Sequence, residues 1–221
     1  MRLYLATIAA DEIRWATAAG LLDGVVATPA ILAAEVPHAD PREVLAELTE
    51  RTDLPIFASV PSLDPAEILR GAKALRKLVE HAIIAVPFVE DALPAVRRLA
   101  TEGIPVAATL VHSAAQGLLA AKAGATHVVV PVDTLEAVGT EAEAVVAELR
   151  DALDRGHAEC DVVVAGAPSA TRFAALALAG AHAAVVTPAA LHAFLQHPLT
   201  DRGIDRFLGD ISRRARPRRT K

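Results

Sequence analysis

The sequence predicts an α/β protein whose eight strand–helix units close into a (β/α)8 barrel. Three observations carry this prediction. Short runs of Val, Ile, Leu and Ala recur along all 221 residues, and they are apolar on both faces, as in parallel strands covered on both sides. Longer amphipathic stretches separate them, as right-handed crossover helices would. The first two runs end in LATIAAD and VVATPA, which lack the glycine-rich phosphate loop of an open doubly wound sheet, the competing architecture.

The eight apolar runs are the predicted strands, taken in chain order. They are Leu3 to Ala6, Gly24 to Ala27, Pro55 to Val60, Ala82 to Pro87, Val106 to Val111, His127 to Pro131, Asp161 to Ala165 and Ala183 to Thr187. Each has a length typical of a strand, and their regular spacing leaves room for one helical crossover after each run.

Helix signals fill the intervals between these runs. Residues 64–80 carry an early Pro, acids near the start and bases near the end, which suits the helix dipole. Apolar residues recur at helical spacing over 141–155. Ser113 is placed to begin a further helix and Gly124 to end it. Residues 134–140 are expected to form a loop.

Two segments follow from this pattern. Residues 1–200 are predicted to be a single barrel domain, because the composition does not change along them. Residues 201–221 are predicted to add an amphipathic helix and a basic tail, RRARPRRTK, over 213–221. A terminal tail of this kind is expected to be solvated and unfolded unless it docks on a partner.

Composition excludes several classes of protein. No apolar run approaches the ~20 residues of a membrane span, and the N-terminal residues lack the features of a signal peptide, so a cytoplasmic protein that does not enter the membrane is expected. The single cysteine, Cys160, allows no internal disulfide and is expected to be a buried small hydrophobe. An acidic body with few aromatic residues argues against nucleic-acid binding. Neither a metal nor a cofactor is expected, since HxH and HExxH spacings are missing.

In a barrel of this kind, the chemistry is expected at the carboxyl ends of the strands. The polar residues predicted to bind a ligand there are Thr28, Ser59, Thr109 and Thr187. His112 and Asp133, after the fifth and sixth strands, are the one plausible acid–base pair. Each also has a structural interpretation, His112 as a loop residue and Asp133 as a turn or helix-capping residue.

Several segments resemble the transaldolase family, and most closely its short bacterial branch, the fructose-6-phosphate aldolases. They are LYLAT (3–7), GVVATPAI (24–31), IFASV (56–60), IIAVP (83–87), EGIPVAATLV (102–111) and AAQGLLAAKAGATHV (114–128). The resemblance covers nearly the whole chain. It implies the same (β/α)8 fold, and also a homo-oligomer, a ring of five or a stacked ten, in which a C-terminal helix reaches over a neighbouring subunit.

The family's reaction is aldol cleavage or transfer through a Schiff base between a lysine and a ketose. By the resemblance, that lysine falls at Ala85 and the aspartate that holds a catalytic water falls at Ala6. The other polar positions of the family fall at Val26, Thr28, Ser59, Pro131, Thr134 and Gly166, and Thr109 alone is retained. The resemblance therefore implies the scaffold without its original catalytic groups, with Ala85 in the wall of a more apolar pocket.

The lysines decide between inherited and altered chemistry, because an imine requires a primary amine. The chain has four, Lys73, Lys77, Lys122 and Lys221, and all are predicted on helices or in the tail. Three hypotheses follow. The mouth binds or converts an uncharged, partly apolar small molecule; or the protein is a non-catalytic oligomeric scaffold or partner of active homologues; or it keeps residual aldolase or transaldolase activity on sugar phosphates. Whether the chain is an enzyme stays open at this point.

Overall fold

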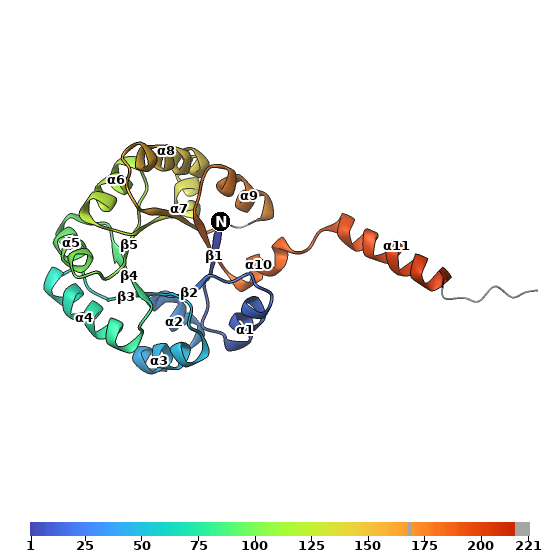
Figure 1. Cartoon of the computed structure of the whole chain (residues 1–221), viewed down its shortest axis with the longest axis horizontal. Coiled ribbons are helices and arrows are strands. Elements are labelled where there is room, and N and C mark those ends of the chain that lie inside the picture. The colour runs from blue at the N-terminus through green and yellow to red at the C-terminus, as the bar shows by residue number, and fades with distance from the viewer. Residues whose placement is uncertain (168, 215–221) are drawn as a thin grey trace, which may run out of the picture.

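The computed structural model describes residues 1–167 and 169–214, with side chains up to residue 211, and confirms the predicted barrel (Figure 1). Eight parallel strands close in sequence order, and β8 returns to pair with β1. The strands are β1 (Arg2–Leu5), β2 (Gly24–Ala27), β3 (Ile56–Ser59), β4 (Ala82–Pro87), β5 (Val106–Thr109), β6 (His127–Pro131), β7 (Asp161–Ala165) and β8 (Ala183–Val186).

Helices surround the ring of strands on its outside, except for the last one, which projects away from it (Figure 1). They are α1 (Ala10–Ala18), α2 (Pro29–Glu35), α3 (Pro41–Arg51), α4 (Pro65–Leu78), the short 3-10 helix η1 (Glu90–Ala92), α5 (Leu93–Thr101), α6 (Ala114–Ala123), α7 (Val132–Ala137), α8 (Ala142–Arg155), α9 (Ala170–Leu178), α10 (Pro188–Phe194) and α11 (Pro198–Arg214).

The capping signals in the sequence correspond to real helix ends. The Asp64 carboxylate accepts the Glu67 backbone N–H at 2.9 Å at the start of α4. Ser113 accepts the Gln116 N–H at the start of α6, and Gly124 ends that helix in the left-handed conformation at φ 106°. These contacts satisfy backbone groups that a helix terminus leaves without partners.

The predicted loop over 134–140 is wrong in its first half, where α7 covers Val132–Ala137. Val132 and Leu135 of this short helix are buried against the core, at 0% and 3% exposed. Two apolar residues three positions apart are too few to show a helical period in the sequence, so tertiary packing decides the conformation here. Gly139, at φ 77°, follows the helix.

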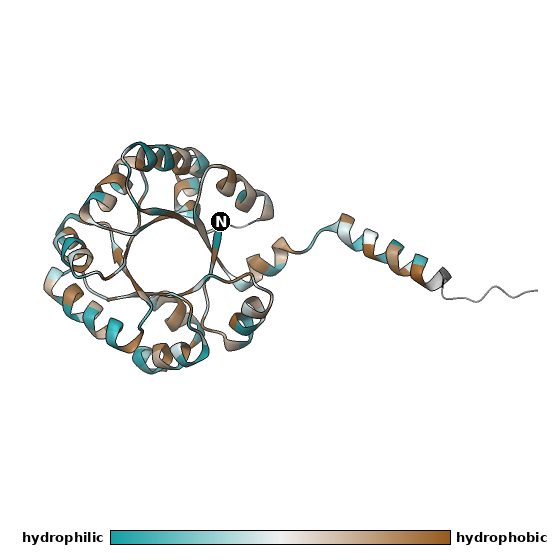
Figure 2. Ribbon diagram, in the orientation of Figure 1, coloured by the Kyte–Doolittle hydropathy of each residue, from teal (hydrophilic) through white to brown (hydrophobic). Residues whose placement is uncertain are grey.

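The barrel has two apolar cores, because successive side chains of each strand point to opposite faces of the sheet. The larger one lies between the sheet and the surrounding helices. The smaller one fills the interior of the ring and consists of Tyr4, Val26, Phe57, Ile83, Ala107, Val163 and Ala183. Figure 2 shows the apolar strands in the centre and the more polar outer faces of the helices. Because side chains two positions apart share a face, Ser59, Ala85 and Thr109 lie on the inner face, one step nearer the carboxyl end.

Charged groups lie at the opposite, amino-terminal end of the barrel. The Asp161 carboxylate of β7 lies 2.5 Å from the Arg2 guanidinium of β1 and 3.6 Å from Nε2 of His127 on β6. His127 is 8% exposed, and its Nδ1 lies 2.9 Å from the Thr126 hydroxyl. Burial lowers the pKa of His127 to about 4, although the nearby Asp161 carboxylate acts in the opposite direction.

Helix α11 extends away from the barrel (Figure 1). Ile204, Phe207 and Ile211 lie on it at helical spacing and are 50%, 64% and 49% exposed. The predicted amphipathic helix is thus present and begins at Pro198, while the basic tail lies outside the described residues from position 215 on. No helix in the described part of the chain is both long and apolar enough to cross a membrane.

Candidate active site and adjacent pocket

The carboxyl ends of the strands form the mouth of the barrel, where three predicted residues lie on neighbouring strands. Ser59 pairs with Ala85 across β3 and β4, and Pro87 pairs with Thr109 across β4 and β5. Ala85 is 5% exposed, so its methyl group is part of the wall and not a reactive group. The structure therefore brings Ser59, Ala85 and Thr109 together on one side of the mouth.

Thr28 and Thr187 each begin a helix. The Thr28 hydroxyl oxygen accepts the Ile31 backbone N–H of α2 at 3.4 Å, and that of Thr187 accepts the Ala190 N–H of α10 at 3.2 Å. A capping role accounts for both residues, and each hydroxyl keeps its proton for donation. Their predicted contact with a ligand stays a prediction.

His112 follows β5 through a strained turn. Leu110 has φ 60°, a left-handed conformation that few residues other than glycine adopt. The His112 backbone N–H donates to Oε1 of Gln116 at 2.8 Å, which ties this turn to α6. The imidazole itself makes no hydrogen bond or ion pair to another described residue.

Asp133 lies in the first turn of α7, next to the end of β7. Its carboxylate occupies the space beside Gly166, where a Cβ atom would lie 2.5 Å from Oδ2. Gly166 has φ 91°, a conformation that favours glycine. The missing side chain also leaves room for the Asp133 carboxylate. Among the described residues no hydrogen bond joins Asp133 to His112, and their acid–base pairing stays a prediction.

A contact between the Glu35 carboxylate and the loop after β1 was not predicted. The Thr7 hydroxyl, 1% exposed, donates to Oε1 of Glu35 at 2.7 Å, and the Ile8 backbone N–H donates to Oε2 at 2.9 Å. Glu35 thereby fixes the loop that follows Ala6. Glu35 ends α2, 28 residues away in the chain, and no local pattern in the sequence links it to Thr7.

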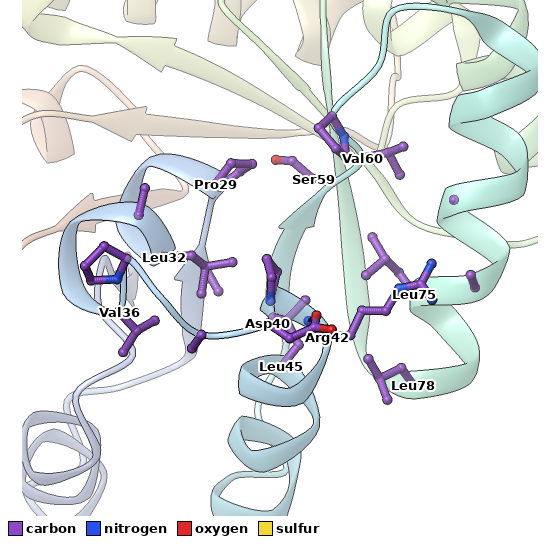
Figure 3. A pocket seen from close by; sticks show the side chains of 18 of the residues that line it. Pro29, Leu32, Val36, Asp40, Arg42, Leu45, Ser59, Val60, Leu75 and Leu78 are labelled. Carbon is purple, nitrogen blue, oxygen red and sulfur yellow. Dashed lines mark hydrogen bonds between the residues drawn. The ribbon is translucent and has the colours of Figure 1, made fainter.

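A pocket of about 850 Å³ lies beside the barrel, between α2, α3 and α4 (Figure 3). We call it the α2–α4 groove. Its walls are mostly aliphatic, and Ser59, at the end of β3, reaches its edge. Sequence reasoning missed this pocket, because it is a gap between three helices and each helix separately has an ordinary apolar face.

The lysines of the described residues all lie on outer helices. Lys73 and Lys77 are on α4, Lys122 is in the last turn of α6, and all three are exposed. The Lys73 ammonium lies 2.8 Å from a Glu102 carboxylate oxygen. None of them is on a strand, so no described lysine side chain lines the interior of the barrel. Within residues 1–167 and 169–214, no three His, Cys, Asp or Glu side chains are arranged to hold a metal ion.

A family model and individual relatives both match nearly the whole chain. Residues 3–216 match the family described as Transaldolase/Fructose-6-phosphate aldolase. A probable transaldolase of Streptococcus agalactiae serotype V is 34% identical over 210 residues, covering 95% of this chain and 97% of that protein. Probable transaldolases of Desulfosudis oleivorans and Alkaliphilus metalliredigens are 36% and 37% identical over 210 residues, with the same coverage.

Proposed function

The chain belongs to the transaldolase/fructose-6-phosphate aldolase family, and from that premise we propose that it has lost the family's Schiff-base reaction. Its mouth instead binds or converts an uncharged, partly apolar small molecule. The observation that carries the proposal is Ala85, a buried methyl group on the inner face of β4 where the resemblance places the reactive lysine.

Chemistry makes this substitution decisive. A ketose carbonyl forms an imine only with a primary amine, and neither the hydroxyls nor the imidazole at the mouth can replace it. Ala6 stands at the position that corresponds, by the resemblance, to the water-holding aspartate. Its backbone N–H donates to the Val186 carbonyl at 2.8 Å, and its methyl side chain cannot hold a water. Both steps of the inherited reaction, imine formation and proton transfer, therefore lack their side chains.

The remaining mouth residues suit a ligand with few charges. Ala85 and Pro131 make its wall apolar, while Ser59 and Thr109 supply hydroxyls that orient a polar group. His112 and Asp133 are the groups we assign to proton transfer if the ligand is converted.

Borohydride trapping tests the loss of the Schiff base. The protein is incubated with dihydroxyacetone or fructose 6-phosphate, reduced, digested and examined by mass spectrometry. We expect no adduct on any lysine above the level of a sample without substrate. The Ala85→Lys variant is the matched positive control, because it returns an amine to β4 and is expected to acquire an adduct at that position.

An adduct on Lys73, Lys77 or Lys122 of the unaltered protein, accompanied by cleavage of fructose 6-phosphate, would overturn the proposal in favour of residual aldolase activity. Methyl-labelled NMR spectra recorded with neutral polyols and ketones test the other part of the proposal, that the mouth binds an uncharged small molecule. Shifts confined to Ala85 and its neighbours support a binding mouth. A mouth that responds to no compound favours the non-catalytic alternative.

A homo-oligomer, which the non-catalytic scaffold alternative requires, is supported by one observation, the exposed apolar stripe of α11. Helix α11 presents Ile204, Phe207 and Ile211 without a barrel surface beneath them (Figure 1). Contiguous exposed apolar surface of this kind marks contacts with another protein. We propose that α11 contacts a second copy of the chain and so builds a homo-oligomer, and we expect five or ten subunits by resemblance to the family.

Replacing the stripe tests this assembly. We expect the Ile204→Asp, Phe207→Asp variant to elute as a monomer in light-scattering chromatography at concentrations where the unaltered protein is an oligomer. Buried charges would cost several kcal/mol at such an interface, about tenfold in affinity for each 1.4 kcal/mol. Arg206→Ala, on an exposed polar position of the same helix, should leave the mass unchanged. An unaltered protein that is itself a monomer would refute the assembly.

A further inference from the structure

The α2–α4 groove shares Ser59, at its edge, with the barrel mouth, and the proposed function uses no other residue of its lining. Figure 3 shows Leu32 and Val36 of the α2 region on one side and Leu75 and Leu78 of α4 on the other, with Leu45 of α3 between them. A volume of about 850 Å³ lies within the range of small-molecule sites, ~300–1,000 Å³. Its size and aliphatic walls suit a flexible hydrocarbon chain.

The inner wall of the groove is rigid and lies close to the sheet. A Cβ atom at Gly71 of α4 would lie 2.6 Å from Cγ1 of Val60, so glycine lets the helix approach the end of β3. Leu45 is 4% exposed and anchors α3 to the core. The groove is therefore bounded by packed elements, and a ligand would enter a preformed site.

The groove is lined by two cationic side chains and one carboxylate. Arg42 of α3 and Lys77 of α4 line the groove and are exposed, and no ion pair or hydrogen bond engages either side-chain cation within the described chain. Some other helix cations have carboxylate partners, such as Arg51 with Glu47 at 3.0 Å and Lys73 with Glu102 at 2.8 Å. Arg70 and Lys122 also have no partner among the described residues, but neither lines the groove. The one acid in the lining, Asp40, accepts the Arg42 backbone N–H at 2.8 Å and caps α3.

We propose that the groove binds a free anionic amphiphile, a carboxylate attached to an aliphatic chain. The carboxylate pairs with Arg42 and Lys77, and the chain lies along Leu32, Leu45 and Leu75. The two cations supply charge-assisted hydrogen bonds, and the walls supply the burial of apolar surface that drives entry of the chain. In a chain of net charge −5, two cations without partners on one apolar groove are the feature that selects an anion.

Decanoate is the probe, used below the concentration at which it forms micelles, with decanol and decylamine as matched ligands. Titration calorimetry on the full chain is expected to give a dissociation constant for decanoate at least tenfold below that for decanol, and weaker binding still for decylamine. The Arg42→Ala, Lys77→Ala variant should lose at least tenfold in decanoate affinity and little in decanol affinity. Arg70→Ala, an exposed cation of α4 outside the groove, is the control and should change neither by more than twofold.

Methyl-labelled spectra locate the binding, with the expected shifts at Leu32, Leu45 and Leu75. The proposal is overturned if decanoate does not bind, if decanol binds equally well, or if the double variant binds as the unaltered protein does. It is also overturned if α11 of a second copy occupies the groove. Oxidation of a mixture of Leu78→Cys and Phe207→Cys chains would then form an intermolecular disulfide, and decanoate would bind only after α11 is removed. None of these outcomes depends on the chemistry at Ala85.

Discussion

Gly24→Ala is expected to destabilise the barrel by about 3 kcal/mol, the upper part of the range for an overpacked core. Gly24 begins β2 and is buried inside the ring. A Cβ atom there would lie 2.6 Å from Cδ1 of Tyr4 and 2.7 Å from the backbone oxygen of Pro55. Neither neighbour can move cheaply. The Tyr4 ring is 2% exposed and packs on Phe57 at 4.8 Å, and the Pro55 oxygen accepts the Val25 backbone N–H at 2.9 Å.

Urea denaturation at a fixed protein concentration measures this effect, because assembly would otherwise shift the apparent stability. Gly203→Ala is the matched control. Gly203 lies on α11 with no atom within 4 Å of an added Cβ, so alanine there should be neutral or stabilise by up to about 1 kcal/mol. Equal midpoints for Gly24→Ala and the unaltered protein would show that the β2–β3 pairing yields more easily than these contacts indicate.

The fold could be predicted from the sequence because the hydrophobic pattern of the strands and the capping residues of the helices indicate the same architecture. A parallel barrel buries both faces of each strand, so runs such as Val162–Val164 are uniformly apolar, and the observed strand ends differ from the predicted ones by at most two residues. Pro, Ser and Asp at helix starts marked the boundaries of α4 and α6. By contrast, α7 has six residues and only Val132 and Leu135 buried, which is too short a pattern to detect.

The site was only partly accessible, for a different physical reason. Topology alone places the strand ends together, so the sequence is enough to group Ser59, Ala85 and Thr109. The groove and the Thr7–Glu35 contact depend on how neighbouring helices approach each other, and side-chain packing between helices leaves no local period in the sequence. The sequence also does not predict the contact between the Asp133 carboxylate and Gly166. That contact depends on the positive φ of Gly166 and on the side chain of a residue 33 positions earlier in the chain.

Acidification from pH 7 to pH 5 is expected to lower the free energy of unfolding by about 2 kcal/mol through His127 alone. His127 has a pKa of about 4 in the folded chain, against 6.5 as its ordinary value, with burial as the main cause. Between those two values the unfolded chain binds a proton that the folded chain excludes, so stability falls as pH falls. Its contribution is constant above about pH 6.5 and is lost progressively down to about pH 4. The pKa of His182 is lowered in the same direction, first by burial and then by Arg150, and adds to the effect.

His127→Gln isolates the contribution, because glutamine keeps a polar side chain there without titrating in this range. The variant is expected to be less stable at pH 7, since the hydrogen bond with Thr126 and the T-shaped contact with the Phe57 ring, whose centroid lies 5.4 Å from that of the imidazole, both change. Its stability should nevertheless fall by about 2 kcal/mol less than that of the unaltered protein between pH 7 and pH 5. His38→Gln, at an exposed histidine between α2 and α3, is the matched control substitution. Parallel pH profiles for His127→Gln and the unaltered protein would mean that Asp161, 3.6 Å away, offsets the burial of the imidazole and lets it carry a proton inside the barrel.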